Sequence, residues 1–142
     1  MKSLLVIAAL SLSFASFGQC VKCRSFEEAA KDPAKVKSII INAAQDKQLK
    51  EIPASIKQFT NLEELMLTDH GLTSVPKEIG SLTKLKTLSL AGNALKKLPE
   101  GLFKLKQLKE LILFDNAFSE KYIEELDKKV TKDMPDTELM TD

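Results

Sequence analysis

Apolar side chains recur along the chain at a fixed interval of 23 residues. Leu62, Leu85 and Leu108 occupy the same place in three successive units. Three further positions keep this interval: Leu65, Leu88 and Leu111; Leu67, Leu90 and Leu113; and Leu72, Leu95 and Phe118. A period of this length indicates a repeat architecture, because each unit is one supersecondary structure that buries its apolar face against its neighbours.

Each unit begins with the apolar spacing of a strand and continues with a less regular spacing. Leu65 and Leu67 are two residues apart, which is the strand period, so both are predicted to point inward. Pro76 and Pro99 come later in their units, where a fixed φ and a missing N–H suit an irregular or short helical return limb. The pattern therefore predicts a strand, a turn and a return limb in every unit.

The turn of each unit carries a polar side chain. Asn93 and Asn116 lie there, and an Asn side chain can hydrogen-bond neighbouring backbone groups. Lys47 and His70 replace Asn in the two earlier units, which puts an unbroken asparagine ladder in doubt. We interpret His70 as a partly exposed turn residue.

The full pattern, LxxLxLxxNxLxxLPxxIxxLxx, resembles the leucine-rich repeat family in its 23-residue form, over roughly residues 36–126. The resemblance implies an α/β solenoid, a right-handed β–α superhelix of about four coils with a parallel sheet on its concave face. It also implies a small exported bacterial protein whose concave face binds other proteins, without catalysis and without a cofactor.

The first coil is the least regular. Val36, Ile39 and Ile41 supply its strand, and Leu49 begins its return limb. The intervening segment carries about three residues more than the pattern requires. We therefore expect residues 42–48 to bulge from the turn.

Both ends of a solenoid expose apolar side chains and need caps. Ser25 and Glu28 form a capping-box pattern that opens a short helix. Ser119 can cap a longer helix through about Thr131, and an edge strand with Leu139 turned inward follows. The predicted organisation is a signal peptide at 1–18, a cysteine-containing segment with a capping helix at 19–35, repeats at 36–118 and a C-terminal cap at 119–142.

The first residues have the composition of a secretory signal peptide. Lys2 precedes an apolar run at 4–12 that is too short to span a bilayer, and small residues up to Gly18 place cleavage there. Lipid anchoring at Cys20 is disfavoured, because Gln19 precedes it where lipoprotein signals usually carry a small side chain. We expect an exported protein that is periplasmic, secreted or held at the cell surface.

The charge of the chain is balanced. Lys and Arg number 21 and Asp and Glu number 20, and loss of Lys2 with the signal peptide leaves no net charge. This balance argues against a nucleic-acid partner, which requires a basic face. No second apolar run reaches membrane length, so no transmembrane segment is predicted.

Cys20 and Cys23 are the only cysteines, and export places them in an oxidising compartment. We favour a local disulfide ahead of the N-terminal helix, with a bond to a partner as the alternative. Redox activity of the thioredoxin kind needs a different fold around the pair. Two thiolates without further Cys or His ligands make a poor zinc site, so no metal is predicted.

No catalytic residue is predicted. His70 is the only histidine, and no phosphate loop, H-E-x-x-H pattern or nucleophile elbow accompanies it. Enzymatic or redox-accessory activity is therefore the third of three hypotheses, behind protein binding and structural self-association.

Outward strand positions stack into columns on a parallel sheet, and these columns predict the binding surface. Ile40, Met66, Ile112 and Phe114 are outward apolar side chains that the fold does not require, and contiguous exposed apolar surface often marks a contact site. The candidate protein-binding residues are Ile40, Glu64, Met66, Thr68, Thr87, Ser89, Ala91, Glu110, Ile112 and Phe114. The expected partner is a protein or peptide. The alternative is a structural role, in which the same columns or the sheet edges serve self-association into a homo-oligomer or attachment to a cell-surface assembly.

Overall fold

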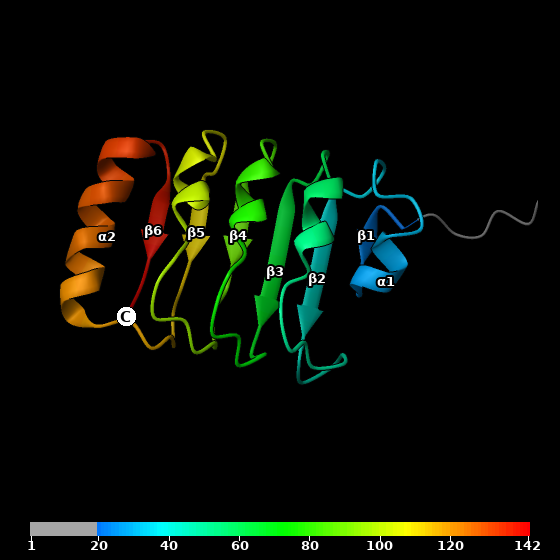
Figure 1. Ribbon diagram of the computed structural model, residues 1–142, viewed down its shortest axis with the longest axis horizontal. Helices are drawn as coiled ribbons and strands as arrows, with labels where there is room; N and C mark the ends of the chain where they lie inside the picture. Colours follow the sequence, from blue (N-terminus) through cyan, green and yellow to red (C-terminus); the bar gives the residue numbers. More distant parts are fainter. Residues whose placement is uncertain (1–19) are drawn as a thin grey trace, which may run out of the picture.

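The computed structural model describes residues 20–142, so the predicted signal peptide at 1–18 lies outside the described part of the chain. Six parallel strands form one sheet whose order in space is their order in the sequence (Figure 1). The strands are β1 (Lys22–Cys23), β2 (Ser38–Asn42), β3 (Glu64–Thr68), β4 (Thr87–Ser89), β5 (Glu110–Ile112) and β6 (Glu138–Met140). The α/β leucine-rich solenoid that the repeat predicts is therefore the observed architecture.

The register of the sheet follows the 23-residue interval. Leu65 lies opposite Leu88, and Leu88 lies opposite Leu111, so equivalent leucines stand side by side on neighbouring parallel strands. Ile39 extends this row at one end and Leu139 at the other. Ile39, Leu65, Leu88 and Leu111 are each 0% exposed, and inward side chains of this kind form one continuous core.

The return limbs are short 3-10 helices that begin directly after a proline. Pro53, Pro76 and Pro99 each cap one limb with extended backbone, as their fixed φ allows. The limbs are η1 (Ala54–Gln58), η2 (Lys77–Ser81) and η3 (Glu100–Lys104). Each sends an aliphatic side chain into the core, and these are Ile56, Ile79 and Leu102.

The core agrees with the predicted inward positions. All seven such residues of the second unit are buried: Leu62, Leu65, Leu67, Leu72, Val75, Ile79 and Leu82. Each contributes roughly 1.5–3 kcal/mol when it leaves water. The backbones of adjacent limbs also touch, because a Cβ on Gly80 would lie 2.5 Å from the carbonyl oxygen of Gly101. Glycine is needed there for the limbs to stack this closely.

A ladder of side-chain hydrogen bonds closes the turns. Asn93 Oδ1 accepts from the N–H of Leu72 at 3.0 Å, and its Nδ2 donates to the carbonyl of Leu67 at 2.9 Å. Asn116 repeats this pattern with the N–H of Leu95 and the carbonyl of Leu90. Each Asn thus ties its own turn to the coil before it.

His70 continues the ladder, which corrects its expected exposure. The side chain is 2% exposed instead of lying partly in solvent. Its Nδ1 accepts from the N–H of Leu49 at 3.1 Å, and its Nε2 lies 3.0 Å from the carbonyl of Ile41. Asn93 bonds the equivalent N–H and carbonyl groups one coil later. A neutral His70 ring with its proton on Nε2 therefore accepts and donates in the same way as the Asn side-chain amide that it replaces.

Helices lie at the two ends of the sheet (Figure 1). The N-terminal helix α1 (Phe26–Ala29) starts at Ser25, whose hydroxyl accepts from the N–H of Glu28. At the other end, α2 (Glu120–Asp133) starts at Ser119 as expected and ends two residues beyond the predicted Thr131. Leu126 and Val130 of α2 are buried. Across residues 20–142, no helix is long and apolar enough to cross a membrane.

The role of His70 in the ladder can be tested with a pair of substitutions. His70→Asn restores the amide used by later coils and should leave the free energy of unfolding within about 1 kcal/mol of wild type. His70→Leu removes the partner of the Leu49 N–H and the donor to the Ile41 carbonyl, and each unmade buried bond costs about 1–3 kcal/mol. Urea unfolding monitored by circular dichroism measures both; equal stability of the two variants would contradict the assigned role.

Candidate functional site

The outward side chains of the sheet lie in three columns on the concave face. Ser38, Glu64, Thr87, Glu110 and Glu138 pair in register as the first column. The second column, which pairs in the same way, is Ile40, Met66, Ser89, Ile112 and Met140. Asn42 and Thr68 pair in the third column. Ala91 and Phe114 continue this column, because the carbonyl of Ala91 accepts from the N–H of the residue after Thr68, and the carbonyl of Phe114 accepts from the N–H of the residue after Ala91.

An apolar band runs along the second column and into the third. Ile40 and Phe114 are each 39% exposed, which makes them two of the three large apolar side chains that the described chain exposes to this degree. Met66, Ile112 and Met140 are half-buried in the same band. Packing inside the coils does not require these side chains, because they stand on the opposite side of the sheet from the core.

Ser89 departs from the predicted binding set. It stands in the second column as expected, yet it is only 3% exposed. Its register neighbours are Met66 and Ile112, which both carry longer side chains. Ser89 therefore offers almost no area to a partner, whereas Thr68, Thr87 and Ala91 remain half-buried.

Two of the three carboxylates of the first column, those of Glu64 and Glu110, accept hydrogen bonds from hydroxyl groups and not from cations. Ser38 Oγ donates to Glu64 Oε2 at 2.5 Å, and Thr87 Oγ1 donates to Glu110 Oε2 at 3.2 Å. Each bond joins neighbouring strands and fixes the position of one carboxylate on the concave face. Their negative charges are oriented but not neutralised.

The rim at the beginning of the strands is an ion-pair ladder. Glu63 lies between Lys86, at 2.6 Å, and Lys37, at 3.1 Å. Hydrogen bonds from Lys86 and Lys37 hold the pKa of Glu63 below its ordinary value. Lys109 and Asp136 form the next pair at 3.6 Å. The charges of this rim are therefore largely compensated within the rim itself.

The rim at the end of the strands is acidic. Asp69, Gly92 and Asp115 follow three successive strands, and all three have left-handed backbone with φ of 64°, 67° and 52°. Asp and Gly tolerate this conformation better than other residues. The Asp69 carboxylate leans over Gly92, where an added Cβ would lie 2.0 Å from Oδ1. Asp142 Oδ2 accepts from the N–H of Asp115 and adds a further acid to the row.

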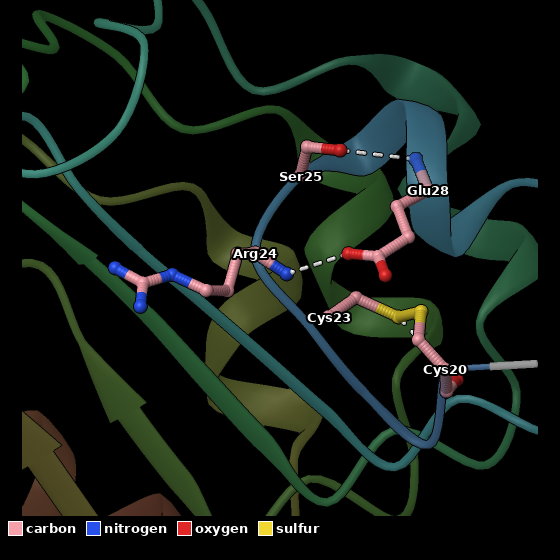
Figure 2. The surroundings of a disulfide bond; sticks show 5 residues. All are labelled: Cys20, Cys23, Arg24, Ser25 and Glu28. Atoms are coloured by element: carbon pink, nitrogen blue, oxygen red, sulfur yellow. Dashed lines mark hydrogen bonds between the residues drawn. A yellow bond between two sulfur atoms is a disulfide. The ribbon is translucent and has the colours of Figure 1, made fainter. Parts of the chain in front are cut away.

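The N-terminal segment contributes a strand that the sequence pattern does not predict. Cys20 and Cys23 are joined in a disulfide, and α1 follows directly (Figure 2). The bond closes the bend in which the Val21 carbonyl accepts from the N–H groups of Lys37 and Ser38. Two-residue β1 is thereby attached to the edge of β2.

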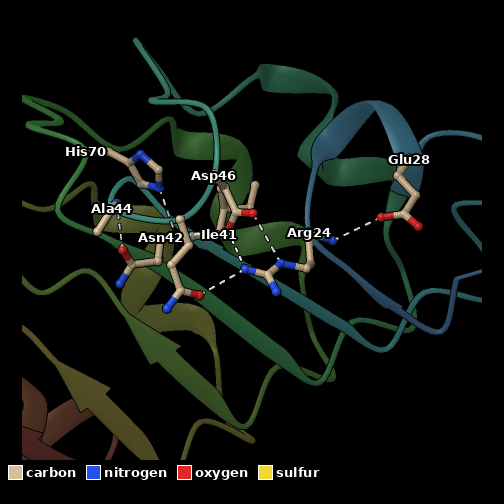
Figure 3. A network of polar contacts seen from close by, with 8 residues as sticks. Arg24, Glu28, Ile41, Asn42, Ala44, Asp46 and His70 are labelled. Carbon is tan, nitrogen blue, oxygen red and sulfur yellow. Dashed lines mark hydrogen bonds and ion pairs between the residues drawn. The ribbon is translucent and has the colours of Figure 1, made fainter.

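Arg24 connects this N-terminal segment to the first turn (Figure 3). Its guanidinium lies 3.2 Å from Asp46 Oδ1 and donates to Gln45 Oε1 at 3.0 Å. Asp46 also accepts from the N–H of Asn42 at 3.1 Å. The hydrogen bond from Arg24, followed by that from Asn42, holds the pKa of Asp46 below its ordinary value. The expected bulge at 42–48 is therefore a closed turn held to Arg24, two residues before α1.

A pocket of about 520 Å³ lies between α1 and this turn. Phe26, Ile41 and Leu49 give it apolar walls, while Lys47 and Lys50 line it with charge. This pocket is not predicted by the repeat pattern, because it forms only where the irregular first coil meets the N-terminal cap. Its lining residues, which also include Ser25, Glu27 and Asp46, contain no histidine or cysteine. Both ring nitrogens of His70 already bond backbone atoms, which leaves that ring no nitrogen for proton transfer to a substrate.

Comparison with known proteins agrees with the coil geometry. The family described as "Leucine rich repeat" matches residues 60–118. A leucine-rich repeat protein from Leptospira interrogans superposes with a TM-score of 0.65 and 33% sequence identity, over 74% of this chain and 25% of that chain.

The chain belongs to the leucine-rich repeat family.

A second solved structure, of the Toll–Spätzle complex from Drosophila, shares the fold of this leucine-rich repeat chain with a TM-score of 0.52 and 23% identity, over 67% of this chain and 12% of that chain. The chain thus spans a quarter of the length of the Leptospira protein. No curated protein matches it. Leucine-rich repeat domains generally serve as protein-interaction modules, and the concave columns are where this chain presents side chains that its own core does not use.

The contact between Arg24 and Asp46 predicts a change at acidic pH. The folded-state pKa of Asp46 lies below 3.8, so the stabilisation is complete above 3.8 and is lost as pH falls through the lowered pKa. An NMR titration of the Asp46 carboxyl carbon should show its midpoint moving up in Arg24→Gln. Lys22→Gln removes a nearby charge that has no contact with Asp46 and should leave the midpoint unchanged. An unchanged midpoint in Arg24→Gln would contradict the assigned cause.

Proposed function

We propose that this leucine-rich repeat chain is a non-enzymatic interaction module that binds a protein or peptide on its concave face. The observation that carries the proposal is the apolar band of Ile40, Met66, Ile112 and Phe114 on the side of the sheet away from the core. Burying that band against a partner removes apolar area from water, at roughly 25 cal/mol per Å². The hydrogen-bonded carboxylates beside the band orient the partner on it.

The proposed place of action is outside the cytoplasm, after export. The signal-like composition of residues 2–18 supports it, and so does the Cys20–Cys23 disulfide, since such bonds persist in oxidising compartments. In that setting the disulfide holds β1 on the sheet edge while the concave face remains available to a partner.

Self-association is the second candidate. Among the residues that the structure describes, strand β6 is the last in the sheet and pairs only with β5, at the end where α2 lies (Figure 1). An edge strand with one partner is a place where a further strand can pair. A second copy could use this edge or the apolar band. Sedimentation at rising protein concentration separates self-association from binding of a foreign partner.

The concave site can be tested by a triple substitution of Met66, Ile112 and Phe114 to Ser, which removes apolar area without adding charge. Affinity capture from the medium or envelope of the source cells should recover partner with wild type and lose most of it with the variant. The matched control replaces three exposed residues on or just before the return limbs with Ala: Ser55, Ser74 and Lys96. Undiminished recovery with the concave variant would move the site elsewhere on the molecule.

A further inference from the structure

The charges around the apolar band are strongly unequal. Three acids of the first column face the concave side, and three more follow the strands at the opposite rim. These are Glu64, Glu110 and Glu138, and Asp69, Asp115 and Asp142. Within residues 20–142, none of the six lies in an ion pair with Lys or Arg. The only basic residue in register with the columns is Lys22, at the end strand β1.

Basic residues that balance these acids lie elsewhere. The whole chain has a formal net charge of +1, so an acidic concave side requires a basic surface on other parts of the molecule. Exposed lysines on and beside the return limbs supply it, including Lys57, Lys77, Lys96, Lys97, Lys104 and Lys106. The molecule is therefore polarised, with negative charge at the proposed binding face and positive charge opposite.

The spacing of these features indicates the shape of the matching partner. The first column and the acidic rim are five residues apart along a strand, from Glu64 to Asp69, which corresponds to about 16 Å. The apolar band lies between them. An α-helix with its side chains is about 10–12 Å across, so a helix on the band has room for long basic side chains on both flanks.

The length of the sheet sets the length of the contact. Six strands at about 4.8 Å per step place β1 and β6 about 24 Å apart. At about 1.5 Å per residue, a helix of about 16 residues covers this distance along the columns.

We infer that the partner segment is a cationic amphipathic helix of about four turns, with an apolar stripe against Ile40, Met66, Ile112 and Phe114 and with Lys or Arg on both sides of that stripe. This inference rests on the proposed function and adds the class of partner. Cation–carboxylate contacts at an interface mainly set specificity and association rate, so such a partner is selected and oriented by charge while the apolar band supplies area.

The test uses a 16-residue peptide of Leu and Lys with Leu on one helical face, carrying a fluorophore, and a second peptide in which Glu replaces every Lys. Fluorescence anisotropy should show binding of the cationic peptide to the wild-type chain, weakening as salt rises. The anionic peptide should not bind. Glu64→Gln, Glu110→Gln and Glu138→Gln combined should weaken binding of the cationic peptide about tenfold, since each exposed ion pair that is lost contributes modestly to affinity.

A matched control separates this site from general attraction between opposite charges. Glu51→Gln, Glu124→Gln and Asp127→Asn combined change the net charge equally at exposed positions away from the concave face and should leave affinity within about twofold of wild type. Gln keeps an acceptor oxygen for the Ser38 and Thr87 hydroxyls, and circular dichroism melts confirm that all variants are folded.

Three results would overturn the inference: no binding of the cationic peptide, equal binding of both peptides, or equal weakening by the concave and control substitutions. The proposed function is tested separately by capture of the native partner. If capture depends on Met66, Ile112 and Phe114 but is indifferent to Glu64, Glu110 and Glu138, the binding face stands and the cationic class of partner is rejected.

Discussion

The structure depends on the inability of a single coil to bury its own leucines. A unit of 23 residues has a strand, a turn and one short limb, which cannot surround Leu65, Leu67 and Leu82 without the units on either side. Stacking removes these side chains from water and simultaneously pairs every strand with the next. The side chains on the other side of the sheet are consequently not needed for the core. They are therefore available for binding.

The regular part of this architecture could be predicted from the sequence, because apolar side chains at a fixed interval are stable almost only in a shared core. Leu65, Leu88 and Leu111 stand side by side as their interval requires. Local effects could also be predicted from the sequence. The prolines before the return limbs act through a fixed φ, and Ser119 before α2 acts through a capping hydroxyl.

Features that depend on two distant segments could not be predicted in this way. His70 is buried because Ile41 and Leu49, in the coil before it, offer a carbonyl and an N–H at the right separation for an imidazole. Strand β1 depends on the Val21 carbonyl meeting the N–H groups of Lys37 and Ser38. The closed first turn depends on Arg24 meeting Asp46 across 22 positions of sequence. Ser89 could be placed on the correct face, but the alternation of strand positions does not indicate its 3% exposure.

That burial has a consequence for how the apolar surface of the sheet is divided. Ser89 stands in the middle of the second column, between Met66 and Ile112 in register, and at 3% exposure it offers almost no surface. The apolar side chains that a bound chain can reach therefore form two groups, one at Ile40 and Met66 and one at Ile112 and Phe114. Met66 and Ile112 are two strands apart, which corresponds to about 10 Å. A chain lying along the sheet would thus be held at two separate anchor points with a set distance between them.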